Sequence, residues 1–350
     1  MTDPAPEKPG RRPRYRGPNP RRFDEKYKEH DPGRYSDDVA RVIAAGKTPA
    51  GTHRPIMVRE ILDVLTPRPG EVAVDCTIGY GGHALGLLEA VQPGGRLLGI
   101  DVDPIELPRA EARLRALGHP PGSVTVRRMN YAGLAGFLAA EAPGGADVLL
   151  ADLGLSSMQI DDPSRGFTFK ADGPLDMRMN PGRGEPASAW LSKLGESGLA
   201  RILSENADEP DAGRLARTIL LAHADRPLTT TRALASVVRA ACDRSPGRPR
   251  GTADDPVRRV FQALRIAVND EYGALESFLR ALPSCLKPGG RVAILTFHSG
   301  EDRRVKAAFK DGRQAGAYAS IAREVVRASA EERRANPRST SAKLRFAVRR

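Results

Sequence analysis

The sequence has few aromatic residues, only three cysteines and no long apolar run. Aromatic side chains make up 5% of its 350 residues, which argues against a single-strand nucleic-acid binder that relies on base stacking. The cysteines are odd in number and widely spaced, so the pattern predicts neither a disulfide framework nor a thiolate metal site. We therefore expect a reducing compartment and no bound metal.

No segment approaches the roughly 18 consecutive apolar residues that a membrane span requires. The N-terminal sequence MTDPAPEKPGRRPRYRG also lacks the apolar stretch of a secretory signal. These two absences predict a cytoplasmic protein with no membrane partner.

The net charge of +12 is carried by the two ends of the chain. Residues 1–50 hold 12 Lys and Arg against 8 Asp and Glu, residues 301–350 hold 14 against 6, and the middle holds 29 of each sign. Residues 1–50 are also rich in Pro and Gly, which predicts a basic, mostly disordered extension. Charge placed in this way can concentrate a protein on nucleic acid without reading its sequence.

Strand and helix patterns alternate after residue 50, stop near residue 158 and resume after residue 250. Apolar runs predict strands at 71–75, 96–103, 124–127, 147–153, 291–297 and 343–348. Helical spacing predicts helices at 56–65 and 105–117 and one long amphipathic helix over 257–282. The alternation is typical of an α/β fold with a parallel, doubly wound sheet.

Helical patterns replace the strands between residues 159 and 250. They cover 187–194, 196–203, 212–223 and 230–241. We therefore predict a helical subdomain over 159–250. It is inserted between two halves of one α/β domain, 51–158 and 251–350.

A glycine-rich loop follows the first predicted strand and precedes a helix. Its spacing, Gly79-x-Gly81-x-x-Ala84, lets backbone N–H groups approach a ligand closely. Asp101 ends the second strand, where a carboxylate can accept both hydroxyls of a ribose. Together these features predict an adenosine-containing cofactor. The alternative is a tight turn between packed elements, with Asp101 capping the next helix.

Both S-adenosylmethionine and NAD would place a ribose on such an acid. Asp75 precedes the glycines at a distance suited to a ligand amine, and His83 stands where a pyrophosphate needs an unobstructed backbone. The fourth strand ends in Asp152-Leu153-Gly154, over the expected reacting centre. These features favour S-adenosylmethionine, with an NAD-dependent oxidoreductase as the alternative.

Eight segments between residue 53 and the C-terminus carry a family resemblance, and the longest of them, at 165–180, is too irregular to arise from periodicity. They are HRP at 53–55, DCTIGYGGH at 75–83, IDVDP at 100–104, DLGLSS at 152–157, RGFTFKADGPLDMRMN at 165–180, FQALRIAVN at 261–269, GRVAILTFHSGEDRRVK at 290–306 and NPRSTSAKLR at 336–345. In these segments the chain resembles the ribosomal RNA small-subunit methyltransferase H family.

The resemblance implies a Rossmann-like class I S-adenosylmethionine-dependent methyltransferase with an inserted helical subdomain. It implies methylation of the exocyclic 4-amino group of a decoding-centre cytidine in 16S rRNA. The implied donor-binding residues are Gly81, Gly82, His83, Asp101, Tyr131, Asp152 and Gln159. Two of them have simple alternatives, since Tyr131 could be a core aromatic residue and Gln159 a surface residue.

Three residues are candidates for the chemistry that the resemblance implies, namely Asp152, Asp176 and His298. Asp152 could accept hydrogen bonds from the cytosine amine, and His298 could take the released proton. The alternatives are a structural His298 at the end of the fifth strand and an ion pair between Asp176 and Arg178.

The implied partner is 16S rRNA in the small ribosomal subunit, and a homodimer is left open. The helical insertion is the segment expected to grip the RNA. Its expected phosphate contacts are Arg165, Arg178 and Arg183.

The chain departs from the family pattern at a few places on its expected RNA side. Gly300 replaces a leucine, Asp255–Arg258 replaces a His-Pro-Ala-Thr pattern, and Asn206–Glu209 replaces a Tyr-Gly-Glu-Glu pattern. Residues 1–50 are expected to have no family counterpart. These departures leave two alternatives: a paralogue acting on another RNA or DNA base, and a catalytically weak rRNA-binding assembly factor.

Overall fold

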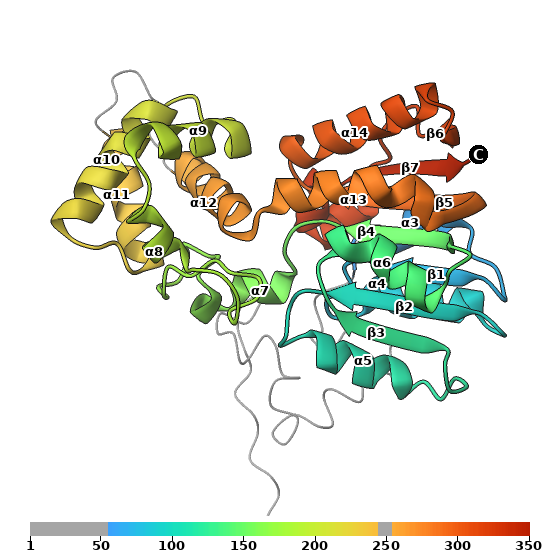
Figure 1. Ribbon diagram of the computed structural model, residues 1–350. Coiled ribbons are helices and arrows are strands. Elements are labelled where there is room, and N and C mark those ends of the chain that lie inside the picture. Colours follow the sequence, from blue (N-terminus) through green and yellow to red (C-terminus); the bar gives the residue numbers. More distant parts are fainter. Residues whose placement is uncertain (1–54, 244–253) are drawn as a thin grey trace, which may run out of the picture. The chain divides into compact units, whose positions relative to one another are not determined.

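A seven-stranded sheet forms the centre of the protein, with the strand order β3-β2-β1-β4-β5-β7-β6 (Figure 1). The computed structural model describes residues 55–243 and 254–350, so the predicted basic extension over 1–50 lies outside the described residues. The strands are β1 (Val72–Asp75), β2 (Arg96–Asp101), β3 (Val124–Arg128), β4 (Ala146–Asp152), β5 (Leu286–Thr296), β6 (Tyr318–Ile321) and β7 (Lys343–Arg349).

Strands β1 to β5 pair in parallel, as the alternating pattern predicts. The prediction of an all-parallel sheet is wrong at one edge, because β7 runs antiparallel to both β5 and β6. Strand β6 was not predicted. Only Tyr318 of its four residues is buried, so it lacks the apolar run that marked the other strands.

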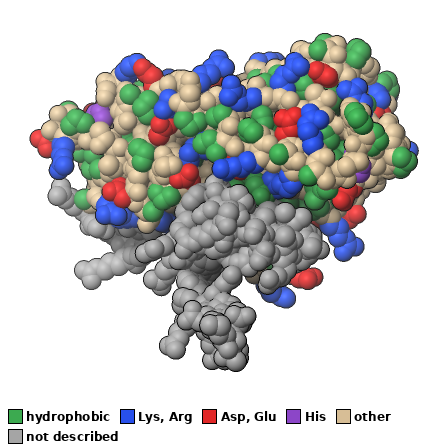
Figure 2. All heavy atoms as spheres, turned by 90° about the horizontal axis from the view of Figure 1, so that it is seen from below, with side chains coloured by type: hydrophobic (Ala, Val, Ile, Leu, Met, Phe, Trp, Pro, Cys, Tyr) green, Lys and Arg blue, Asp and Glu red, His purple; other side chains and the backbone are tan. Residues whose placement is uncertain are grey.

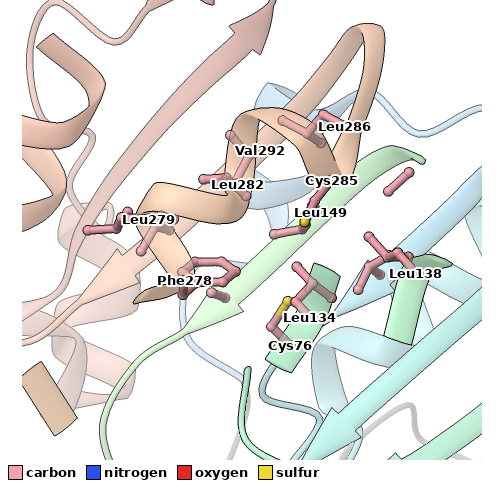
Figure 3. Close-up of a cluster of buried hydrophobic side chains, with 14 of the residues drawn as sticks. Cys76, Leu134, Leu138, Leu149, Phe278, Leu279, Leu282, Cys285, Leu286 and Val292 are labelled. Atoms are coloured by element: carbon pink, nitrogen blue, oxygen red, sulfur yellow. The ribbon is translucent and has the colours of Figure 1, made fainter. Parts of the chain in front are cut away.

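Helices cover both faces of the sheet (Figure 1). Side chains on a strand alternate between faces, and β1 shows this: Ala73 packs in one core cluster and Val74 in the other. The first cluster includes α3 (Val58–Leu65), α4 (Gly82–Val91) and α5 (Leu107–Arg115). The second includes α6 (Leu134–Glu141), α13 (Glu271–Cys285) and α14 (Ser299–Gln314), and Figure 3 shows Phe278 and Leu282 of α13 within it. The doubly wound arrangement is therefore confirmed.

The four helices predicted in the insertion are all present. They are α8 (Ala187–Leu191), α9 (Glu196–Ala207), α10 (Ala212–Asp225) and α11 (Thr231–Asp243). They share a hydrophobic core with α12 (Asp254–Asn269), which contributes Val257, Val260 and Leu264. The core of the insertion therefore continues past residue 250, where the sequence placed its end.

The prediction of one long helix over 257–282 is wrong. The chain breaks at Asp270, which has a left-handed backbone with φ of 48°, a conformation that Asp adopts more readily than most residues. The break lets α12 pack inside the insertion while α13 packs on the sheet. A continuous apolar stripe in the sequence concealed two different packing partners.

The remaining short elements lie in the connections. They are α7 (Ser157–Asp161), α15 (Ala330–Ala335) and the 3₁₀ turns η2 (Tyr131–Gly133), η3 (Pro163–Arg165) and η4 (Pro337–Ser341). None of the helices within 55–243 and 254–350 is long and apolar enough to cross a bilayer.

A buried carboxylate after β2 attaches the insertion to the sheet. Asp103 is 1% exposed, and its Oδ2 accepts hydrogen bonds from Arg165 Nη1 at 2.9 Å and Gln159 Nε2 at 2.7 Å. Its Oδ1 accepts the N–H of Ile105 at 2.8 Å. Arg165 also donates to the carbonyl of Met179 at 2.7 Å. Every oxygen of this buried acid is therefore engaged, as a buried charge requires.

We expect Arg165→Met to lower the free energy of unfolding by about 3–5 kcal/mol, because it leaves Asp103 buried without its cation. Denaturant unfolding monitored by circular dichroism measures the loss. Arg115→Met is the matched control, since Arg115 pairs with Glu111 at 2.7 Å on the surface, where such a pair is worth about 1 kcal/mol or less. Equal losses in the two variants would contradict a special role for the buried pair.

Candidate active site

The glycine loop between β1 and α4 takes a conformation that glycine favours. Gly79 and Gly81 have φ angles of 47° and 83°, in the left-handed region that is strained for most other residues. A Cβ atom on Gly82 would lie 2.2 Å from the ring of Pro55. The loop is thus held tightly at the start of α4, where the N–H of Gly81 donates to the carbonyl of Ile78 at 2.6 Å.

Asp101 organises this loop from the end of β2. Its Oδ2 accepts the N–H of Gly79 at 2.8 Å, and its Oδ1 accepts the N–H of Asp103 at 2.9 Å. An ionised carboxylate offers about four lone-pair directions, so these two bonds do not use all the positions at which it could accept ribose hydroxyls. Asp101 does not cap the following helix, because α5 begins at Leu107 after Glu106 and has no side-chain cap. The ribose contact of Asp101 stays a prediction.

Two carboxylates lie where the strand order reverses, at the ends of the neighbouring strands β1 and β4. Asp75 is 1% exposed, and its Oδ1 accepts the N–H of Thr77 at 3.0 Å. Asp75 Oδ2 and Asp152 Oδ1 are buried and have no hydrogen-bond partner among the described residues. Ligands of open α/β sheets bind at such a switch point.

His83 stands beside these acids. Its Nδ1 lies 3.6 Å from Asp152 Oδ2, and its Nε2 lies 2.9 Å from the carbonyl oxygen of Ile56. A carbonyl can only accept, so Nε2 carries the hydrogen and a neutral ring presents the Nδ1 lone pair to Asp152. Burial lowers the pKa of His83, which favours this neutral form.

Burial also sets the charge of the two acids. It raises the pKa of Asp75 to about 6. Burial and, to a lesser degree, the charge of Glu301 raise the pKa of Asp152 to about 7. Unpartnered carboxylate oxygens with raised pKa values are suited to a cationic ligand, which would stabilise their ionised forms.

His298 and Glu301 form a second buried pair, at the start of α14. His298 Nε2 lies 3.1 Å from Glu301 Oε1, and neither ring nitrogen has a hydrogen bond of good geometry within the described part of the chain. Glu301 is 4% exposed and accepts the N–H of Phe297 at 3.0 Å. Burial would raise its pKa, but His298 and Arg265 outweigh burial and lower it. Glu301 therefore stays ionised beside His298.

Asp176, the third predicted catalytic residue, is tied to Arg178. The guanidinium binds both carboxylate oxygens, at 2.8 and 2.7 Å. Although partial burial opposes the effect, these bonds lower the pKa of Asp176. An ion-paired acid with a lowered pKa is a weak proton acceptor, so Asp176 is not proposed as a catalytic group. The alternative of a pair within the insertion is the one that the structure contains.

Gln159 and Tyr131 both have structural contacts. Gln159 is 8% exposed and not a surface residue. Its Oε1 accepts the N–H of Ser156 in a capping box, and its Nε2 donates to Asp103. Tyr131 is half-buried and packs edge to face on Phe278, with ring centroids 5.4 Å apart. Donor contacts of Gln159 and Tyr131 stay predictions.

The phosphate contact predicted for Arg165 is wrong, because its side chain is 7% exposed and paired with Asp103. Asp103, Glu301 and Tyr272 were not predicted from the sequence. A signal existed for two of them: Asp103 lies two residues after Asp101, and Glu301 follows His298 by one helical turn. No group of three or more His, Cys, Asp or Glu side chains suited to a metal was found within 55–243 and 254–350.

The structure places a glycine loop and three strand-end acids near the switch point of a doubly wound sheet, an arrangement typical of α/β proteins that bind nucleotides. A sequence profile described as the MraW methylase family matches residues 50–350. The chain belongs to this family. Membership in a methylase family identifies the cofactor as S-adenosylmethionine and rules out the NAD alternative.

Several curated proteins resemble the chain over nearly its whole length. "Ribosomal RNA small subunit methyltransferase H 2" of Alkaliphilus metalliredigens is 47% identical and covers 98% of both chains. "Ribosomal RNA small subunit methyltransferase H 1" of Lachnoclostridium phytofermentans is 44% identical over 97% of this chain and 92% of its own. "Ribosomal RNA small subunit methyltransferase H" of Rubrobacter xylanophilus is 44% identical over 86% and 96%. The family resemblance is confirmed.

These alignments correct one expectation. A match that covers 98% of this chain must include most of residues 1–50. The N-terminal extension therefore has a counterpart in some relatives, whereas the Rubrobacter protein matches a smaller share of the chain.

We expect Asp101→Ala to weaken binding of S-adenosylhomocysteine by about 10- to 100-fold, the loss of one or two hydrogen bonds to a charged group. Isothermal titration calorimetry measures this affinity. Asp63→Ala, which removes an acid that is 69% exposed on α3, is the control and should bind normally. Unchanged affinity in Asp101→Ala would remove this residue from the ribose site.

We expect Asp152→Asn to stabilise the ligand-free protein progressively between pH 4 and pH 7. In this window the unfolded chain ionises Asp152 near its ordinary pKa of 3.8, whereas the folded chain retains the proton up to about pH 7, so wild-type stability falls as pH rises. At about 1.4 kcal/mol per pKa unit, the gain at pH 8 is at most about 4 kcal/mol. Thermal unfolding at pH 5 and pH 8 measures this gain in stability. A gain that is the same at both pH values would contradict a raised pKa of Asp152.

Proposed function

We propose that this protein transfers a methyl group from S-adenosylmethionine to the exocyclic 4-amino group of a decoding-centre cytidine in 16S rRNA, within the small ribosomal subunit. The shared motifs and the names of the curated relatives support the substrate. The observation that carries the chemistry is Asp152 Oδ1, a buried oxygen without a partner at the switch point of the sheet.

The cytosine amine is a poor nucleophile, because its lone pair is delocalised into the ring. Asp152 would accept a hydrogen bond from the NH₂ group and so favour the charge that develops as nitrogen bonds to carbon. The donor supplies the methyl group on a positively charged sulfur. The ends of β1 and β4 would hold the reacting atoms in line at near-attack distance.

The amine must also lose a proton when its new bond forms. His298 would accept it, because its ring nitrogens are buried and have no well-formed hydrogen bond within the described residues. Glu301, 3.1 Å from Nε2 and held ionised, would stabilise the resulting imidazolium. His298 and Glu301 would thus move the proton away from Asp152.

A base inside folded RNA must leave its stack to reach this site. The insertion of helices α8 to α12 is the proposed gripping element. On the face that Figure 2 shows, Lys and Arg side chains are spread among Asp and Glu side chains instead of gathering in one block. Arg183, which is exposed in the insertion, is the phosphate contact that we still propose.

We expect purified protein to transfer label from methyl-labelled donor to small subunits that lack the decoding-centre modification. Mapping the modified base and mass spectrometry of the nucleosides identify the product. Asp152→Ala should lower turnover at least 100-fold, while Asp147→Ala, which removes an acid paired with Lys287 at the far end of β4, should retain activity.

Label at another base would indicate a paralogue with a different target. Salt-dependent binding to small subunits without any transfer would indicate an assembly factor. Substantial turnover by Asp152→Ala would exclude Asp152 from a central role.

A further inference from the structure

We propose that Tyr272 is a positioning residue that holds His298 in place for the reaction, and that Gly300 leaves the space in which it does so. Tyr272 lies in the first turn of α13 and is 9% exposed. Its ring centroid is 6.0 Å from that of His298. The inference deepens the proposed function, because it rests on the role of His298 in that reaction.

The close approach of Tyr272 to Gly300 is the main observation. A Cβ atom on Gly300 would lie 1.8 Å from the Tyr272 hydroxyl oxygen and 2.8 Å from its Cζ. The same atom would lie 3.3 Å from Nδ1 of His298. Only glycine at this position lets the tyrosine hydroxyl, the backbone of α14 and the histidine ring meet.

The tyrosine cannot easily swing aside, because its ring is held by residues from two other helices. Its hydroxyl donates a hydrogen bond to the carbonyl of Asn206, at the end of α9, at 3.2 Å. The guanidinium carbon of Arg304 lies 3.6 Å from the ring centroid, and Arg304 Nη1 also donates to the carbonyl of Gly300 at 3.1 Å. Burial raises the pKa of Tyr272 to about 12, so the hydroxyl keeps its proton and remains a donor.

Two segments of the chain meet at this residue. Gly300 and the segment Asn206–Glu209 are far apart in the sequence, but Tyr272 contacts Gly300 and bonds to Asn206. Asp208 continues the contact by accepting a hydrogen bond from Ser299 at 2.8 Å and pairing with Arg303. The end of α9 and the start of α14 are therefore parts of one contact between the insertion and the turn that carries His298.

The experiment compares two glycine-to-alanine changes in the same helix. Gly300→Ala places a methyl group against Tyr272. Gly312→Ala is the matched control, because its Cβ atom would lie 2.6 Å from the ring of Tyr318, a residue that packs away from the site in the sheet core. Both changes should lower the Tm, and both variants should bind S-adenosylhomocysteine within twofold of wild type.

Only Gly300→Ala should lower kcat at least tenfold in methyl transfer to small subunits. Only this variant should also move the acid limb of the rate–pH profile, since a displaced His298 loses its place beside Glu301. Equal losses of kcat in the two variants, or an unmoved acid limb, would overturn the proposal and leave Tyr272 a packing residue.

Changes at Tyr272 separate the ring from the hydroxyl and do not depend on a steric clash. Tyr272→Phe keeps the ring and should retain kcat within threefold, whereas Tyr272→Leu should lose at least tenfold. Adding Gly300→Leu to Tyr272→Leu refills the vacated space and should recover most of the loss, so the two changes should be strongly non-additive. Additive losses would contradict the inference.

A readout without substrate separates this proposal from the proposed function. The ring resonances of His298 in an NMR spectrum of the whole protein should shift in Gly300→Ala but not in Gly312→Ala. If wild-type protein fails to methylate small subunits while this shift is seen, the substrate assignment fails and the positioning contact stands. If transfer occurs and the resonance does not move, the positioning proposal fails alone.

Discussion

The buried carboxylate of Asp103 is the contact on which both the insertion and the site depend. It binds Arg165 and Gln159 from the segment that leads into the insertion, while Asp101, two residues earlier, binds Gly79 of the glycine loop. A single turn after β2 therefore fixes both sides of the site. A charge this deep is tolerated because each carboxylate oxygen of Asp103 accepts a hydrogen bond. Only an arrangement that keeps these bonds is therefore stable.

The site acids divide into two kinds by their surroundings. Asp103 and Glu301 are buried with cations or other donors, and Glu301 stays ionised. Asp75 is buried and Asp152 is half-buried, and each has one buried oxygen without a partner among the described residues. Burial therefore raises their pKa values towards neutrality. Contrasting environments of this type let neighbouring acids serve different roles. Here they distinguish acids that hold the protein together from acids available to a ligand.

Much of the fold could be predicted, because strands buried on two faces leave unmistakable apolar runs. Apolar runs predict the five parallel strands. The glycine spacing predicts the loop, and the end of the second strand marks Asp101. Strand β6 was not predicted, since only one of its four residues is buried and one buried residue makes no pattern. The break at Asp270 was not predicted, since an apolar stripe does not show which part of the protein it packs against. Arg165 was misassigned for a related reason: the sequence shows a cation but not the buried acid that neutralises it.

The sequence by itself determined the family, the order of the elements and the residues at the ends of the strands, because irregular motifs and local periodicity are properties of short segments. The tertiary structure alone decided which charges are paired. It tied Asp176 to Arg178, left Asp152 Oδ1 without a partner, and brought Tyr272 against Gly300. These outcomes depend on how segments far apart in the chain are packed together. That packing sets the protonation states of buried acids and the space around each side chain, and neither can be read from a local pattern.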